Sequence, residues 1–159
     1  MTWRLILAAY QTAYFLGYHI RKPGSPGWCN TADNTNLLFW VVYYLEKTLC
    51  LRLGRCSTIP DFEITAPLPG GSPAMEYCAS AVKMAALAGK IYEKLYSAQA
   101  LISLSENGAL QVAELSGELD AIREQSQIAL VSFRKPISMP PRRLPMLVDV
   151  VYRLTSHTG

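Results

Sequence analysis

Histidine, charge and long apolar runs are all scarce in this sequence, and each scarcity excludes a class of protein. Only 2 of the 159 residues are His, the base that most often activates a Ser or Cys nucleophile. The net charge of +3 is too weak to draw the chain to nucleic acid by electrostatics alone. The longest charge-free apolar run, Leu37 to Leu45, is well below the roughly 20 residues that cross a bilayer. We therefore expect a soluble protein with no membrane contact.

The cysteines do not form a metal-binding pattern. No C-x-x-C pair occurs, and the close pair Cys50 and Cys56 has no His nearby, whereas a zinc site needs four converging ligands. Two of the cysteines lie in or beside apolar helical stretches, where Cys acts as a small hydrophobe. We expect free, buried thiols, and neither a metal nor another cofactor in this chain. The four cysteines are Cys29, Cys50, Cys56 and Cys78.

Apolar spacing predicts an all-α fold, an irregular array of about five helices with two Pro-rich connectors. The first predicted helix covers residues 3–17, with Gly17 as its C-terminal cap. The second covers residues 36–53 and is apolar on nearly every side until Glu46-Lys47, as is typical of a central helix. A strand is the alternative there, because Val41 and Val42 are β-branched. The length of the segment and the stop at Gly54 favour a helix.

The rest of the chain alternates between connectors and helices. Residues 56–71 contain three prolines and scattered apolar side chains, which predicts an extended connector packed across the helices. Ser72-Pro73 predicts the start of a third helix that ends near Ser97. A turn at residues 105–108 precedes a fourth, amphipathic helix containing Val112 and Leu115. Residues 132–145 form the second Pro-rich segment, and a last helix covers residues 147–156.

The titratable residues do not form a catalytic arrangement, and we predict that the chain is not an enzyme. His19 is expected to cap the first helix, and His157 lies near the C-terminus. The acids of the fourth helix form a solvated face, because paired catalytic acids belong in an apolar cleft. The basic residues of the second connector are better explained by solubility than by phosphate contacts. These acids and bases are Glu114, Glu118, Asp120, Glu124, Arg134, Lys135, Arg142 and Arg143.

Several short strings resemble the fungal-specific transcription factor domain, the middle homology region of zinc-cluster (Zn2Cys6) regulators. The strongest are Leu38-Phe39-Trp40, then Tyr44-Leu45-Glu46-Lys47, then Leu51-Arg52-Leu53-Gly54-Arg55. Ile59, Asp61, Ile64 and Pro67-Leu68-Pro69 follow in the expected order. A later stretch, residues 89–97, also matches, so the resemblance is strongest over residues 8–97.

The resemblance implies a single partial domain over residues 1–159, the C-terminal part of that regulatory region. We expect the motif residues to be structural: some would be buried in the core, and others would end the second helix. We do not expect them to form an effector site. Arg52 and Arg55 are expected to bond the helix-end carbonyls. The motif residues singled out are Leu38, Phe39, Trp40, Leu53, Gly54, Arg55 and Pro67.

The resemblance also sets expectations for function and partners. The six-cysteine zinc cluster that binds DNA in full-length relatives is missing here, so zinc and DNA contacts would belong only to a missing N-terminal domain. We expect a nuclear regulatory region that acts through protein partners or self-association, because an apolar patch left uncovered drives binding. The alternative is a helical module that senses a small-molecule effector, or a stand-alone interaction protein.

Overall fold

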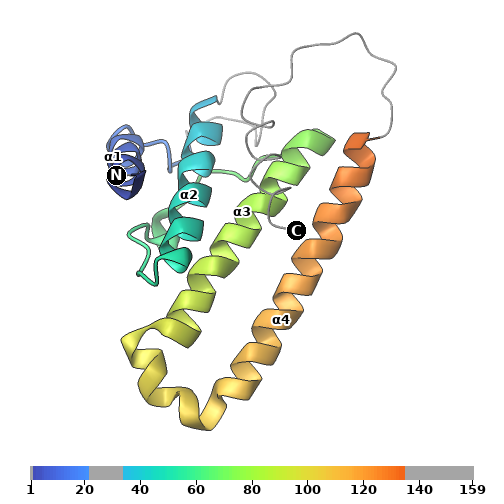
Figure 1. Ribbon diagram of the computed structural model, residues 1–159. Coiled ribbons are helices and arrows are strands. Elements are labelled where there is room, and N and C mark those ends of the chain that lie inside the picture. Colours follow the sequence, from blue (N-terminus) through green and yellow to red (C-terminus); the bar gives the residue numbers. More distant parts are fainter. Residues whose placement is uncertain (1, 22–33, 135–159) are drawn as a thin grey trace.

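The computed structural model describes residues 2–21 and 34–134, and every regular element in these ranges is helical (Figure 1). The predicted all-α class is therefore confirmed. Cys29, His157, the basic run from Lys135 onward and the predicted helix at residues 147–156 lie outside the described residues. The elements are α1 (Thr2–Phe15), α2 (Asn34–Arg52), the 3-10 turn η1 (Asp61–Glu63), α3 (Pro73–Ile91), the π-helical turn η2 (Tyr92–Tyr96) and α4 (Ala98–Arg134).

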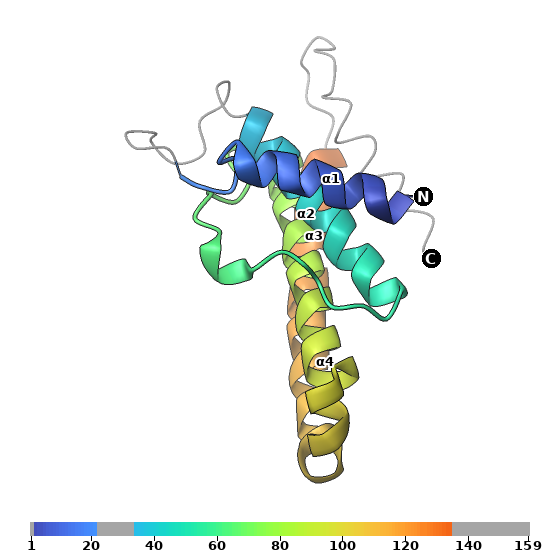
Figure 2. The same cartoon turned by 90° about the vertical axis from the view of Figure 1, so that its left-hand side faces the viewer.

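Helix α2 is the central element, as its apolar sequence predicts. It packs between α1, which crosses one side of it, and α3 on the other side (Figures 1 and 2). Phe39, Trp40 and Tyr43 are buried and form edge-on or tilted ring contacts with centroids 5.3 to 6.4 Å apart. Aromatic pairs in such geometries add to the hydrophobic stabilisation of a core. The core therefore centres on the second helix.

Helices α3 and α4 form a long antiparallel pair (Figure 1). Ser72 caps α3, since its hydroxyl accepts a hydrogen bond from Met75 N at 3.3 Å, and Pro73 occupies the first turn as predicted. Three lysines of α3 and η2 donate to α4: Lys83 to Gln125, Lys90 to Glu118 and Lys94 to Glu114. These exposed contacts fix the register of the pair more than they stabilise it.

The predicted turn at residues 105–108 is wrong, because these residues lie inside α4. The non-helical residue between η2 and α4 is Ser97, whose ψ of 153° is extended. Its hydroxyl accepts a hydrogen bond from Ala100 N at 3.1 Å, which makes it the N-cap of α4. Val112 is exposed, whereas Leu115 is buried, so these two apolar residues of the helix lie in different environments.

Glycines end both α1 and α2, as predicted. Gly17 and Gly54 have φ of 70° and 61°, in the left-handed region that side chains resist. At the end of α2, Gly54 N donates to Leu51 O at 3.1 Å and Arg55 N donates to Cys50 O at 2.9 Å. This is the Schellman pattern. The backbone of Arg55, rather than its guanidinium, bonds the helix-end carbonyl, which corrects the role expected for that side chain.

Candidate functional site

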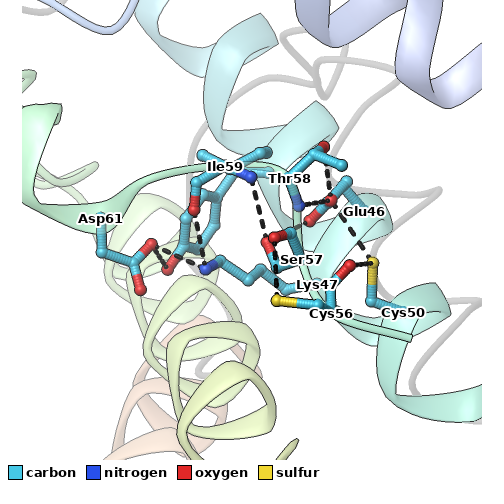
Figure 3. Close-up of polar contacts among 9 residues, drawn as sticks. Glu46, Lys47, Cys50, Cys56, Ser57, Thr58, Ile59 and Asp61 are labelled. Atoms are coloured by element: carbon cyan, nitrogen blue, oxygen red, sulfur yellow. Dashed lines mark hydrogen bonds and ion pairs between the residues drawn. The ribbon is translucent and has the colours of Figure 1, made fainter. Parts of the chain in front are cut away.

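A fully buried carboxylate lies near the end of α2. The Glu46 side chain is 0% exposed and accepts hydrogen bonds from Thr58 N at 2.7 Å, Thr58 Oγ1 at 2.9 Å and Ser57 Oγ at 2.8 Å (Figure 3). A buried carboxylate is costly unless such donors replace its lost hydration. Glu46 therefore binds the start of the connector, residues 56–71, to α2.

The neighbouring lysine is buried as well and binds the next part of the connector. Lys47 is 1% exposed, and its ammonium donates to Ile59 O at 3.1 Å and forms an ion pair with Asp61 Oδ1 at 2.9 Å (Figure 3). The ammonium also lies 5.4 Å from the centre of the Tyr43 ring, within reach of a cation–π interaction. The Lys47 ammonium thus interacts with the Asp61 carboxylate, the Ile59 carbonyl and the Tyr43 ring.

Tyr43 completes this group by donating its hydroxyl hydrogen to Asp61 Oδ1 at 3.0 Å. Burial, followed by the negative charge of Asp61, raises the pKa of the Tyr43 hydroxyl well above its ordinary value. The phenol therefore stays protonated and able to donate. We call the set made of Tyr43, Glu46 and Lys47 on α2 with Ser57, Thr58, Ile59 and Asp61 on the connector the polar clamp.

The remainder of the connector is bound by other contacts. Trp40 Nε1 donates to Pro67 O at 2.9 Å. The backbone carbonyl of His19 accepts hydrogen bonds from Thr65 N and Ala66 N at 3.0 and 2.9 Å. The Tyr14 hydroxyl donates to the Glu63 carboxylate. The connector therefore packs on α2 and reaches the C-terminal end of α1, so it lies on the helices as its scattered apolar residues predict (Figure 2).

Gly89 of α3 leaves room for the buried lysine. A Cβ atom placed on Gly89 would lie 3.2 Å from Lys47 Cδ and 3.3 Å from Lys47 Nζ. Both distances are shorter than ordinary van der Waals contacts, and Lys47 has little freedom to move because the polar clamp holds its ammonium. Gly89 of α3 thus contributes to the polar clamp by leaving the space that the Lys47 side chain occupies.

The family-like motif residues divide into buried and exposed positions. Phe39 and Trp40 are in the core, whereas Leu38 and Leu53 are exposed. Gly54 forms the helix end, and Pro67 supplies the carbonyl that Trp40 binds. Arg55 is exposed at the surface. The structure therefore brings together Trp40 and Pro67, while Leu38, Leu53 and Arg55 lie apart from that contact.

The residues tested for catalysis occupy structural or surface positions. His19 lies beyond the end of α1 and does not cap it; its buried ring stacks on Tyr14 with centroids 4.1 Å apart. Glu114 and Glu118 form exposed ion pairs with Lys94 and Lys90, and the hydrogen bond from Lys94 lowers the pKa of Glu114. Within residues 2–21 and 34–134, no three His, Cys, Asp or Glu side chains gather as a metal site would require.

The described cysteines are free. Burial, followed by the charge of Glu46, raises the pKa of Cys50 to about 12, and burial raises that of Cys78 to about 11. Thiols with such pKa values are poor nucleophiles at neutral pH because little thiolate forms. Cys56 is exposed at the start of the connector. The buried-thiol prediction thus holds for Cys50 and Cys78 but is wrong for Cys56.

A small apolar cavity lies between α2 and α3. Its volume is about 20 Å³, and Trp40, Tyr44, Pro69 and Val82 are among its lining residues. This volume holds about one water-sized probe, whereas pockets for drug-sized ligands measure roughly 300–1,000 Å³. The cavity as it stands gives no support to a small-molecule effector.

Sequence reasoning did not single out Glu46 and Lys47 as a buried site. It treated them as the polar end of an apolar stretch, although both belong to the strings that carry the family resemblance. A charged pair within a helix that is apolar on its other faces was the available signal. Which groups would replace their hydration depends on the path of the connector, and that path is not encoded in local spacing.

Comparisons with known proteins agree with the sequence strings. A family described as the fungal specific transcription factor domain matches residues 1–135. ABC-transporter-regulating transcription factors of Aspergillus oryzae and Aspergillus fumigatus are 25% and 26% identical, over 92% of this chain. Protein STB5 of Saccharomyces cerevisiae is 32% identical over 40% of this chain and 9% of its own length.

The matched region is a minor part of the longer relatives. This chain spans 18% of the length of the two Aspergillus proteins. No solved structure matches it. Across the part of the chain that the structure describes, no helix combines the length and apolarity needed to cross a membrane.

Proposed function

Because this chain belongs to the family of fungal-specific transcription factor domains, we propose that it is the regulatory, protein-contacting region of a fungal transcription regulator and acts in the nucleus. The observation that carries the proposal is the family match over residues 1–135, supported by relatives that are named as transcription factors. Four residues of the polar clamp, Glu46, Lys47, Ile59 and Asp61, also belong to the strings that carry the resemblance.

The proposed role does not include DNA binding by this chain itself. Its four cysteines are fewer than the six of a zinc cluster, and the net charge of +3 gives little attraction to phosphates. Contact with DNA would come from another domain or another protein. We assign no catalytic activity: Glu114 and Glu118 are engaged in surface ion pairs, and the ring of His19 packs on Tyr14.

The test is to fuse the chain to a heterologous DNA-binding domain and measure a reporter gene in a fungal cell. The expected result is a several-fold change in reporter expression compared with the DNA-binding domain alone. A fluorescent fusion should accumulate in the nucleus. Reporter expression indistinguishable from that of the DNA-binding domain alone, at equal protein abundance, would contradict the regulatory role.

Two matched variants test whether the reporter response depends on the folded connector or only on surface charge. Glu46→Ala removes the acceptor that binds Ser57 and Thr58, and it should abolish the reporter response by loosening the connector. Glu118→Ala removes a carboxylate from an exposed ion pair and should leave the response unchanged. Equal loss in both variants would indicate that the response depends on overall charge rather than on the folded connector.

A further inference from the structure

The connector begins with a basic residue and two hydroxyl side chains in close succession. Arg55 is followed three positions later by Thr58, and Ser57 lies between them. Arg55 and Thr58 are exposed, and residues 55–57 belong to no helix. Among the described residues, no ion pair involves the Arg55 guanidinium. An exposed Arg shortly before a hydroxyl, on a non-helical segment, is the charge pattern by which basic-directed protein kinases choose their acceptors.

Thr58 is the better acceptor of the two hydroxyl residues. Ser57 is half-buried, and its hydroxyl both donates to Glu46 Oε2 at 2.8 Å and accepts from Ile59 N at 3.2 Å. The Thr58 hydroxyl donates to Glu46 Oε1 at 2.9 Å and accepts from no described group (Figure 3). Release from Glu46 therefore frees the Thr58 oxygen, whereas the Ser57 oxygen must break contacts on two sides.

We propose that Thr58 is a phosphorylation site for a protein kinase that recognises Arg, and that its phosphate opens the polar clamp. In the reaction, the Thr58 hydroxyl oxygen attacks the γ-phosphorus of ATP, the bond from that phosphorus to the β,γ-bridging oxygen breaks, and ADP leaves. The hydroxyl proton passes to the aspartate base of the kinase. The new phosphate carries a charge of about −1.5 to −2 at pH 7.

This phosphate is incompatible with the position that Thr58 holds in the clamp. The Thr58 oxygen loses the hydrogen that bonded Glu46, and the phosphate and the carboxylate then face each other across what was a 2.9 Å contact. A phosphate beside a Glu disrupts a contact by like-charge repulsion. Three hydrogen bonds from Ser57 and Thr58 end on Glu46, so repulsion at this one side chain acts on all of them. The start of the connector is thereby released.

The end of α2 offers the released phosphate a new partner. Arg52 and Arg55 are exposed there. Pairs between Arg and phosphate are charge-assisted and can be bidentate, which makes them stronger than neutral hydrogen bonds. The unmodified hydroxyl binds Glu46 and the phosphate binds Arg, so the two forms of Thr58 hold the start of the connector in different positions.

The chain contains an internal comparison for the role of the backbone. Ser126 follows Arg123 at the same spacing, but both lie inside α4, and the Ser126 hydroxyl donates to Arg123 O at 2.9 Å. An extended segment at Ser126 would require this helix to unwind. Ser156 also follows Arg153 at this spacing, outside the described residues. We expect Thr58 to be modified and Ser126 to stay unmodified.

Incubation of the full chain with ATP, Mg²⁺ and the catalytic subunit of cyclic-AMP-dependent protein kinase, a basic-directed kinase, tests the site. Peptide mapping by mass spectrometry should place phosphate on Thr58 and not on Ser126. Arg55→Gln should slow incorporation at Thr58 by about tenfold or more, as the loss of a charge-assisted contact implies. Arg123→Gln removes another exposed Arg and should leave the rate unchanged. No phosphate on Thr58, or incorporation that Arg55→Gln does not slow, would overturn the proposal.

Limited proteolysis of the same samples tests the opening of the clamp. The phosphorylated chain should be cut within residues 56–71 several-fold faster than the unmodified chain, and a phosphatase should restore its resistance. Equal cleavage of the two forms would overturn the switch. This comparison uses the wild-type sequence alone, so it does not depend on the folding of a variant.

Glu46→Ala tests whether Thr58 must leave Glu46 before it can react. This variant lacks the acceptor, so Thr58 should be phosphorylated several-fold faster than in the wild type, and the phosphate should add little to the rate of cleavage. Phosphorylation no faster than in the wild type would overturn the coupling between the clamp and the modification. None of these measurements uses a reporter gene, so their outcome is independent of the proposed role in transcription.

Discussion

Glu46 and Lys47 are adjacent in the sequence, yet each binds a different part of the connector. Glu46 accepts from Ser57 and Thr58, whereas Lys47 bonds Ile59 and Asp61. The hydrogen-bond donors around Glu46, and the Ile59 carbonyl and Asp61 carboxylate beside Lys47, explain how two side chains of opposite formal charge lie inside the core. If a donor or acceptor were removed, the remaining charge would be buried without compensation, at a cost of several kcal/mol.

Substitution of Gly89 tests how tightly Lys47 is held. Ala is more favourable than Gly by about 0.8–1 kcal/mol inside a helix, so Gly117→Ala in α4, with open space around it, should raise the free energy of unfolding by that amount. Gly89→Ala should lose this gain to overpacking against Lys47, with a net destabilisation of up to about 2 kcal/mol. Urea unfolding measures both. Equal stabilisation by the two substitutions would show that Lys47 moves aside freely.

The buried thiol of Cys50 predicts a loss of stability in base. Its pKa is raised from 9.0 to about 12 in the folded state, so above pH 9 the unfolded chain releases a proton that the folded chain retains. Its contribution to stability is therefore fully present below pH 9 and declines as pH rises toward 12. Cys50→Ala should give a shallower decline in the free energy of unfolding between about pH 9 and 10. An identical slope would contradict the burial of this thiol.

In the connector, residues 56–71, the sequence predicts the backbone conformation and the structure shows which groups bind it. Its three prolines predict an extended segment, and the polar clamp shows why that segment packs on α2. A backbone without helical or sheet hydrogen bonds needs partners from elsewhere when it packs on a core. Here the side chains of α2 and the carbonyl of His19 provide them.

Release of the connector is the expected effect of breaking the polar clamp. Glu46→Ala leaves the Thr58 N–H and two hydroxyls without their acceptor, at about 1–3 kcal/mol for each group that stays buried. Limited proteolysis should then cut residues 56–71 faster, with a matching loss in the free energy of unfolding. Glu118→Ala, from the exposed pair with Lys90, should cost no more than about 1 kcal/mol. Equal protease resistance in the wild type and Glu46→Ala would contradict the role of the clamp.

At the scale of the whole molecule, stability depends on the aromatic cluster around Trp40. Trp40 is buried, contacts Phe39 and Tyr43, and bonds Pro67 O, so it joins α2 to the far end of the connector. Trp40→Ala should cost about 3–5 kcal/mol. Since domains of this size are stable by only about 5–15 kcal/mol, this change should remove a large share of the stability and lower the melting temperature. Thermal melting followed by circular dichroism measures it, and an unchanged curve would remove Trp40 from the core.

Local pattern alone determined much of this protein. The all-α class, the central position of α2, the ends at Gly17 and Gly54 and the cap at Ser72 follow from apolar period and from backbone preferences, which act within a few residues. The motif strings were likewise sufficient to indicate the family. These features depend on interactions among neighbours in the sequence.

Tertiary structure alone decided the rest. Local composition marked residues 105–108 as a turn, although they lie inside α4, and it marked Glu46 and Lys47 as the polar end of an apolar stretch. Their burial depends on Ser57, Thr58, Asp61 and Gly89, up to 42 positions away from Lys47 in the sequence. Whether a charge can be buried is decided by the groups that replace its water, and only the folded chain brings those groups together.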